Sequence, residues 1–110
     1  MIIGMLGLGF VGQGIIQILS QNRTKLESAL GEAISIKSIA VRDIHKKRNI
    51  PANITLTSDS QSLITDSEID TIIDVISGDS YDYIKQALAS GKHVVSANKS
   101  VIASHQAELL

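Results

Sequence analysis

The sequence contains no cysteine and only one proline among its 110 residues. Without cysteine the chain has no disulfide, no thiolate metal ligand and no cysteine nucleophile. No apolar run in the sequence approaches the roughly 20 residues that a helix needs to cross a bilayer. The N-terminus also lacks the basic region that opens a secretory signal. We therefore expect a cytoplasmic protein.

The sequence has no surplus of positive charge either. Its 10 lysine and arginine residues stand against 11 aspartate and glutamate residues, so the formal net charge is -1. A general nucleic-acid or membrane-surface binder needs a basic surplus, so we expect neither partner. A hydrophobic share of 44% with 19% charged residues is typical of a globular protein. The length accommodates one domain.

The strongest motif lies at the start of the chain. Residues 2–6 are apolar and are predicted to form a buried strand. The motif Gly7-x-Gly9-x-x-Gly12 follows, and it indicates dinucleotide binding when it joins a strand to a helix. A helix is predicted next, because apolar residues recur with the spacing of one helix face: Val11, Ile15, Ile18 and Leu19.

Each glycine of the motif has a physical reason. Gly7 allows a tight turn, Gly9 lets the backbone approach a pyrophosphate, and Gly12 lets the helix pack closely on the strand. The free N–H groups and the positive dipole end of the helix then face the phosphates. A tight turn without a ligand uses glycine in the same way, but the position directly after an uncharged strand favours a cofactor.

Predicted strands and helices alternate along the rest of the chain. Further strands are predicted at 34–41, 56–57, 71–76 and 93–97. Further helices are predicted at 23–30, within 58–70, and at 81–90 with a core face of Ile84, Ala87 and Leu88. Gly31 and Gly91 are predicted to end two of them. A last helix from His105 reaches Leu110 without a C-terminal signal.

This alternation predicts an α/β fold of the Rossmann type. We expect a doubly wound parallel sheet with helices on both faces, truncated at the C-terminus. In such a sheet the ligand lies beyond the carboxyl ends of the strands. The glycine loop, Arg42, Ser77, Asn98 and Lys99 all fall on that edge. The acidic residues at 66–70 have no histidine nearby in sequence, so we expect a solvated turn and no metal site.

Arg42 and Asp43 follow the second predicted strand, where a doubly wound sheet meets the adenosine ribose. A count of about 20 residues from the glycines would point to Glu32 instead, but the helical insertion at 23–30 moves the position further along. An arginine can pair with a 2′-phosphate, and an aspartate can accept a hydrogen bond from a free 2′-hydroxyl. NADP and NAD are therefore both open. The basic cluster at 46–48 favours NADP.

Three stretches together resemble the N-terminal cofactor domain of homoserine dehydrogenases: residues 3–12, 40–43 and 91–99. The likeness covers essentially the whole chain, and the third stretch is far more specific than the glycine motif. The resemblance implies NADP- or NAD-dependent interconversion of L-homoserine and L-aspartate 4-semialdehyde, on the route to threonine, methionine and isoleucine. It also implies that a substrate-binding and dimerisation part follows this 1–110 domain. The full-length protein would then be a homodimer, and this chain alone would bind the cofactor without turnover.

The resemblance also implies roles for single residues. Phe10 and Val11 would contact the cofactor, Arg42 would meet the 2′-phosphate, and Ser77 would lie beside the nicotinamide half. Lys99 would stand at the junction of nicotinamide and substrate. With an ordinary pKa of about 10.4 it is a cation at neutral pH, which can polarise the aldehyde oxygen and donate a proton as the hydride arrives. A purely structural role stays open for both residues: Asn98 as a helix N-cap and Lys99 as a surface lysine at a helix start.

Two other hypotheses stay open as well. One is a nucleotide-sensing module that is not an enzyme, such as the Rossmann-like regulatory domains attached to ion channels. Such a module has no use for a lysine at the nicotinamide end. The other is a different NAD(P)-dependent oxidoreductase, which differs only in its substrate, and a cofactor domain does not decide that.

Overall fold

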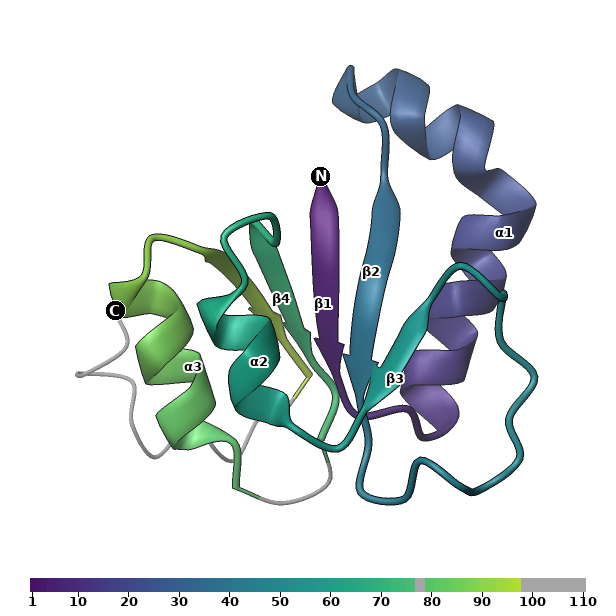
Figure 1. The fold of residues 1–110 in the computed structure, drawn as a ribbon. Helices are drawn as coiled ribbons and strands as arrows, with labels where there is room; N and C mark the ends of the chain where they lie inside the picture. Colours follow the sequence, from purple (N-terminus) through teal and green to yellow (C-terminus); the bar gives the residue numbers. More distant parts are fainter. Residues whose placement is uncertain (77–78, 98–110) are drawn as a thin grey trace.

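The computed structural model describes residues 1–76 and 79–97. In this part of the chain five strands form one parallel sheet in the order β3-β2-β1-β4-β5 (Figure 1). The strands are β1 (Ile2–Leu6), β2 (Ser35–Ala40), β3 (Thr55–Thr57), β4 (Thr71–Asp74) and β5 (His93–Ser96). After β1 the chain forms β2 and β3 on one side of that strand. It then crosses over and forms β4 and β5 on the other side of β1. The doubly wound parallel sheet predicted from the sequence is thus confirmed.

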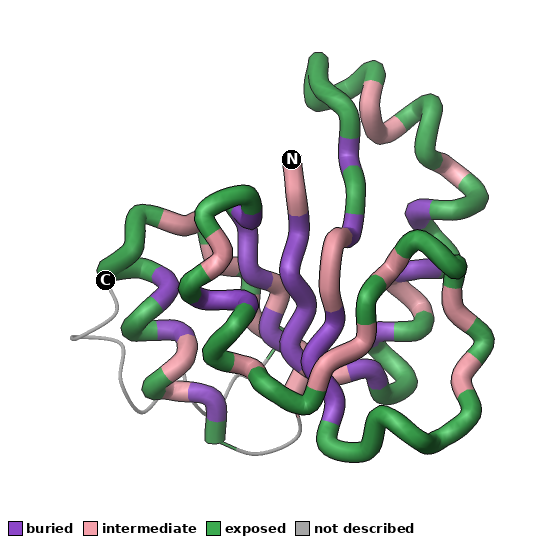
Figure 2. Tube along the Cα trace, viewed as in Figure 1, coloured by how far each residue is buried: buried purple, intermediate pink, exposed green. Residues whose placement is uncertain are grey.

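Helices cover both faces of the sheet, as predicted (Figure 1). The long helix α1 (Phe10–Leu30) lies on one face, and α2 (Ser60–Thr65) and α3 (Tyr81–Ala89) lie on the other. Alternate residues of β1 serve the two faces, since Met5 packs in the α1 core and Leu6 in the α2/α3 core. Figure 2 shows the buried positions along the central strands and on the helix sides that face them. No described helix has the length and apolarity of a membrane span.

Helix α1 is interrupted at the boundary between the two helices that the sequence predicted. Asn22 has non-helical dihedral angles (φ -125°, ψ 18°) inside an otherwise continuous helix. Its side-chain amide donates a hydrogen bond to the carbonyl oxygen of Ile18 at 3.1 Å, and such local bonds compete with the helical backbone pattern. The two predicted helices are therefore one kinked helix. Gly31 ends it in the left-handed region, at φ 75°, as predicted.

The buried face of α1 differs from the prediction. Val11 and Ile18 are 51% and 56% exposed, whereas Gly12, Ile16 and Leu19 are buried. The reason is the close approach of Gly12 to the strand. A Cβ on that residue would lie only 3.2 Å from the carbonyl oxygen of Gly7, so the helix turns its glycine inward. Val11, one residue earlier, then faces the open carboxyl edge of the sheet.

Helix α3 shows a similar shift of its inner face. Ile84 and Ala87 are buried as predicted, but Leu88 is 40% exposed. Ser80 is buried at the start of the helix, and Tyr83 packs partly buried against the α2/α3 core. The inner stripe is thus 80, 83, 84 and 87, which is a regular helical spacing centred before Leu88.

In the acidic turn before β4, Glu68 and Asp70 are exposed, as expected of a solvated turn, whereas Asp66 is half-buried beside Lys37. The ammonium group of Lys37 lies 2.6 Å from the Asp66 carboxylate and 3.1 Å from that of Glu68. Among the described residues, no group of histidine, cysteine and carboxylate side chains could hold a metal ion. The hydrogen bond from Lys37, followed by the one from the backbone N–H of Glu68, lowers the pKa of Asp66 below its ordinary 3.8.

This ion pair predicts part of the acid sensitivity of the fold. A carboxyl group whose pKa is lowered in the folded state stabilises the protein above the unfolded value of 3.8. That contribution is lost as the pH falls through the lower folded pKa. We therefore expect Asp66→Asn and Lys37→Met to lose less stability than the wild type between about pH 6 and about pH 2.5, measured as the urea midpoint.

The double variant Lys37→Met/Asp66→Asn is the control for this pair. It should lose no more stability at neutral pH than the larger single loss, because both changes remove the same contact. Parallel acid curves for the wild type and both single variants would contradict the role of the pair.

Candidate functional site

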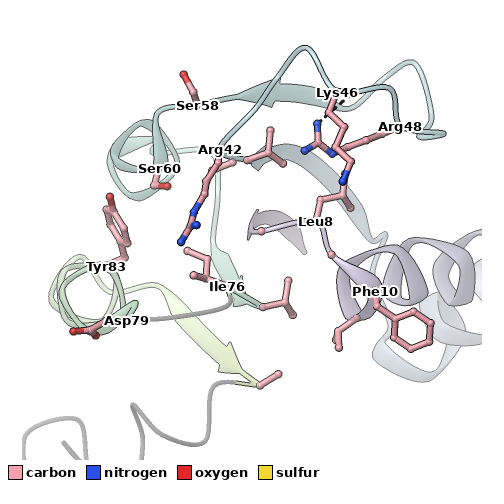
Figure 3. A pocket seen from close by; sticks show the side chains of 17 residues that line it. Leu8, Phe10, Arg42, Lys46, Arg48, Ser58, Ser60, Ile76, Asp79 and Tyr83 are labelled. Carbon is pink, nitrogen blue, oxygen red and sulfur yellow. Dashed lines mark hydrogen bonds between the residues drawn. The ribbon is translucent and has the colours of Figure 1, made fainter.

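A cavity of about 790 Å³ opens at the carboxyl ends of the strands (Figure 3). This volume lies in the range of small-molecule and cofactor sites, about 300–1,000 Å³. Five segments line it: the β1–α1 loop, the end of β2 with the loop after it, the β3–α2 connection, the β4–α3 connection with α3, and the end of β5. The lining residues are Gly7, Leu8, Gly9, Phe10, Val11, Ala40, Val41, Arg42, Lys46, Arg48, Ser58, Ser60, Val75, Ile76, Asp79, Tyr83 and Ala97.

The turn at Gly7 shapes one wall of this cavity. Gly7 has φ 95°, a conformation that other residues rarely adopt. A Cβ there would also come within 3.0 Å of the carbonyl oxygen of Val75. Its N–H donates to the carbonyl oxygen of Ala40 at 2.8 Å, which ties the turn to the end of β2. The backbone therefore turns sharply from β1 into the cavity, as predicted for this glycine.

Gly9 faces open space. A Cβ built on Gly9 would meet no atom within 4 Å. Gly9 is the N-cap of α1, and its carbonyl oxygen accepts the N–H of Gln13 at 3.0 Å. The N–H groups of residues 10–12 precede this first intrahelical bond and have no acceptor four residues back within the helix. The first turn carries no acidic side chain that would compete for them.

The same loop places Phe10 and Val11 at the cavity. Both side chains line it, and Phe10 is 96% exposed. Gly12 does not line the cavity, because it packs inward against the strand. The helix therefore presents its N-terminal N–H groups and two apolar side chains to the open space. This arrangement suits an anion attached to a flat organic group.

Arg42 enters the cavity from the end of β2. The N–H of Val41 donates to the carbonyl oxygen of Thr57 at 2.8 Å, which fixes the backbone just before the arginine. Figure 3 shows the Arg42 side chain pointing into the cavity. Arg42 lines the cavity and Glu32 does not, whereas its predicted contact with the adenosine ribose stays a prediction.

The loop after Arg42 adds more positive charge. Lys46 and Arg48 line the cavity, whereas Lys47 does not. The guanidinium of Arg48 donates to the carbonyl oxygen of Asp43 at 2.6 Å, which holds the loop in place. Three cations therefore line the cavity against the single carboxylate of Asp79 among the residues described. This electrostatic balance favours a negatively charged ligand.

Asp43 is not part of the cavity wall. Its side chain is exposed, and its Oδ1 accepts the backbone N–H of His45 at 2.9 Å. That bond closes a local turn of the kind that aspartate often makes. Of the two residues considered at the end of β2, only the arginine faces the cavity.

The sequence analysis missed several lining residues. Ser58 directly follows β3 and Ser60 begins α2, so the rule that ligands lie at carboxyl ends could have pointed to both. Tyr83 gave no such signal, because it lies inside a helix whose orientation the pattern did not fix. The predicted residues Ser77, Asn98 and Lys99 lie outside the described residues. The residues next to them, Ile76 and Ala97, do line the cavity.

Comparison with known proteins gives a consistent result. The family model described as homoserine dehydrogenase, NAD binding domain, matches residues 7–110. The homoserine dehydrogenase of Bacillus subtilis is 39% identical over 98% of this chain and 26% of its own length. That of Helicobacter pylori is 38% identical over 97% of this chain and 25% of its own length.

Solved structures agree in fold. A homoserine dehydrogenase from S. aureus superposes with a TM-score of 0.89 at 38% identity, over 99% of this chain and 29% of that one. One from Thiobacillus denitrificans gives a TM-score of 0.92 at 33% identity, over 99% of this chain and 26% of that one. The chain thus spans about a quarter of the length of the curated relatives it matches.

Proposed function

The chain belongs to the homoserine dehydrogenase family, whose NAD-binding domain it matches, and we propose that its cavity holds the nicotinamide dinucleotide of such an enzyme. One observation carries the proposal: the N-terminus of α1 opens at Gly9 into a cavity lined by three cations. The residues present fit the cofactor. Backbone N–H groups suit the pyrophosphate, Arg42 suits a phosphate on the ribose, and Val75 and Ile76 supply apolar surface for flat rings.

In the proposed reaction this domain binds and orients the cofactor, and the cofactor would supply the hydride chemistry. The N–H groups of Phe10 and Val11 hold the pyrophosphate, where the helix dipole adds to their hydrogen bonds. We propose that Lys99, which follows β5 in the sequence, supplies a cation to the nicotinamide end. It polarises the aldehyde oxygen of aspartate 4-semialdehyde and gives a proton to the alkoxide as homoserine forms. Asn98 precedes Lys99 in the sequence and Ser77 follows β4, and we propose that both belong to the same end.

We propose NADP as the preferred cofactor, with NAD as the alternative. Arg42, Lys46 and Arg48 line the adenosine side of the cavity and supply the charge that a 2′-phosphate needs. The carboxylate of Asp43, which would favour a free 2′-hydroxyl, is engaged with the N–H of His45.

The complete enzyme needs the rest of its chain. We propose that residues 1–110 form the cofactor domain, and that a further part supplies the substrate site and the homodimer contacts. The enzyme then serves the synthesis of threonine, methionine and isoleucine. This division agrees with the quarter of the relatives' length that the chain covers.

Calorimetric titration of this chain with NADPH and NADH tests the proposal. We expect saturable binding of one molecule per chain and no oxidation of homoserine, because the substrate site is proposed to lie elsewhere. Failure of both dinucleotides to bind would contradict the assignment of the cavity. Homoserine turnover by the chain alone would contradict the proposed division of labour.

The substitution Lys99→Ala in the full-length enzyme tests catalysis separately. We expect kcat to fall by about two orders of magnitude or more with little change in cofactor affinity, since the ammonium acts on the transition state. A nucleotide-sensing module would lose neither property. An unchanged kcat would remove Lys99 from the mechanism.

A further inference from the structure

Asp74, the last residue of β4, is a carboxylate without any exposed surface. Its Oδ2 accepts hydrogen bonds from the hydroxyl of Ser80 at 2.5 Å and from that of Ser96 at 2.9 Å. Its Oδ1 accepts the backbone N–H of Ile76 at 3.1 Å. A buried carboxylate is costly unless such bonds compensate its lost hydration. The carboxylate therefore holds three donors in place around it.

The partners of Asp74 belong to three different segments that border the cavity. Ile76 lies in the β4–α3 connection, Ser80 caps α3, and Ser96 ends β5. The main chain of Asp74 adds a further tie, because its carbonyl oxygen accepts the N–H of Ala97 at 2.9 Å. Ile76 and Ala97 are themselves lining residues of the cavity. Asp74 thus sets the positions of two parts of the cavity wall relative to each other: the β4–α3 connection and the end of β5.

These segments form the half of the cavity opposite Arg42. In the sheet, β1 lies between β2 and β4, so the glycine loop divides the carboxyl edge into two sides. Arg42 and the basic loop after it occupy the β2 side, which we have assigned to the adenosine half of the cofactor. The β4–β5 side is then left for the nicotinamide half, as expected when a dinucleotide lies across the point where the strand order reverses.

We propose that Asp74 is a positioning residue for the nicotinamide half of the site, an inference that rests on the proposed cofactor binding. Asp74 acts through Ile76 and Ser96, which its hydrogen bonds hold at the edge of the sheet where the nicotinamide half would bind. The chain leads from Ala97 directly into Asn98 and Lys99.

Comparison of the whole cofactor with its adenosine half tests the inference. The variants are Asp74→Asn, which keeps the shape of the side chain, and Ser96→Ala, which removes only the bond to β5. We expect both to weaken NADPH binding about tenfold, because the β4–β5 side is then no longer held in the binding geometry and part of the binding energy is used to order it. Binding of adenosine 2′,5′-bisphosphate should change by less than about twofold, because this half-ligand does not reach the β4–β5 side.

Two further variants separate positioning from general stability. Ser96→Thr keeps the hydroxyl and should recover NADPH binding. Ser90→Ala removes a hydroxyl that donates to the carbonyl oxygen of Gln86 within α3, away from the cavity. It should leave both affinities unchanged. Thermal unfolding of each variant gives the fraction that is folded at the temperature of the titration. The measured affinities are then corrected for this fraction.

The positioning role of Asp74 and the binding of the dinucleotide can fail separately. An equal loss of both ligands, or no loss of NADPH, would show that Asp74 serves the fold only. Equal affinity of the wild type for NADPH and the half-ligand would also overturn the positioning role, while leaving dinucleotide binding in place. If the wild type binds neither NADPH, NADH nor the half-ligand, the proposed function itself is wrong.

Discussion

Replacing Gly9 with alanine is expected to weaken NADPH binding about 100-fold, the equivalent of two lost hydrogen bonds to a charged group. The dihedral angles of Gly9 (φ -84°, ψ -155°) are open to alanine, and a Cβ there meets no atom within 4 Å. The variant should therefore fold normally. The added methyl group would occupy the space in which the pyrophosphate meets the N-terminus of α1. Fluorescence titration of NADPH measures the loss.

Gly14→Ala is the matched control for this substitution. Gly14 lies inside α1, does not line the cavity, and also leaves open space around a Cβ. We expect unchanged binding and a stability gain of about 0.5–1 kcal/mol, because alanine is the better helix former. Wild-type affinity in Gly9→Ala would contradict the placement of the phosphates at this helix end.

The substitution Arg42→Ala should remove the preference for NADPH. A guanidinium can pair with a 2′-phosphate through two parallel hydrogen bonds, which alanine cannot replace. We expect NADPH affinity to fall about 100-fold and NADH affinity to change by less than about threefold. Separate titrations with the two dinucleotides at one ionic strength measure the effect, because salt screens such pairs.

Arg23→Ala provides the control for Arg42. Arg23 lies on α1, where its guanidinium donates to the carbonyl oxygen of Ile34, and it does not line the cavity. Its removal should leave the affinities for both dinucleotides unchanged. If the preference for NADPH is absent in the wild type, or survives in Arg42→Ala, the 2′-phosphate is not bound by this arginine.

Local signals predicted most of the fold. The alternation of strands and helices and the end of α1 at Gly31 follow from residues close together in sequence, whereas the two helices predicted on either side of Asn22 form one kinked helix. The prediction of Arg42 came from the end of the second predicted strand. An insertion changes the number of residues between two positions, but it does not change which residue follows a strand. Such features depend on backbone preferences that the sequence carries locally.

Orientation of helix faces was less predictable. Val11 and Ile18 are as apolar as their buried neighbours, so periodicity alone placed the stripe about one residue off. The true orientation depends on how closely Gly12 approaches the strand, which is a tertiary contact. For the same reason Leu88 is exposed while Tyr83 is partly buried.

The sequence pattern did not indicate that Asp74 is buried in a hydrogen-bond network. In the sequence it stands within an apolar strand, and its partners Ser80 and Ser96 lie 6 and 22 residues away. The alignment of β4 with β5 brings Ser96 beside Asp74, and the start of α3 brings Ser80 there. Polar networks of this kind emerge from strand pairing and helix docking, not from local pattern.

Backbone amide NMR of the chain during NADPH titration tests the central claim most directly. If the N-terminus of α1 holds the pyrophosphate, the amide signals of Gly9, Phe10 and Val11 should shift most as the cofactor saturates. Those of Ser35 and His93, at the opposite ends of their strands, should stay in place. Saturable binding that leaves residues 9–11 unshifted would show that the cofactor binds elsewhere and would contradict the account.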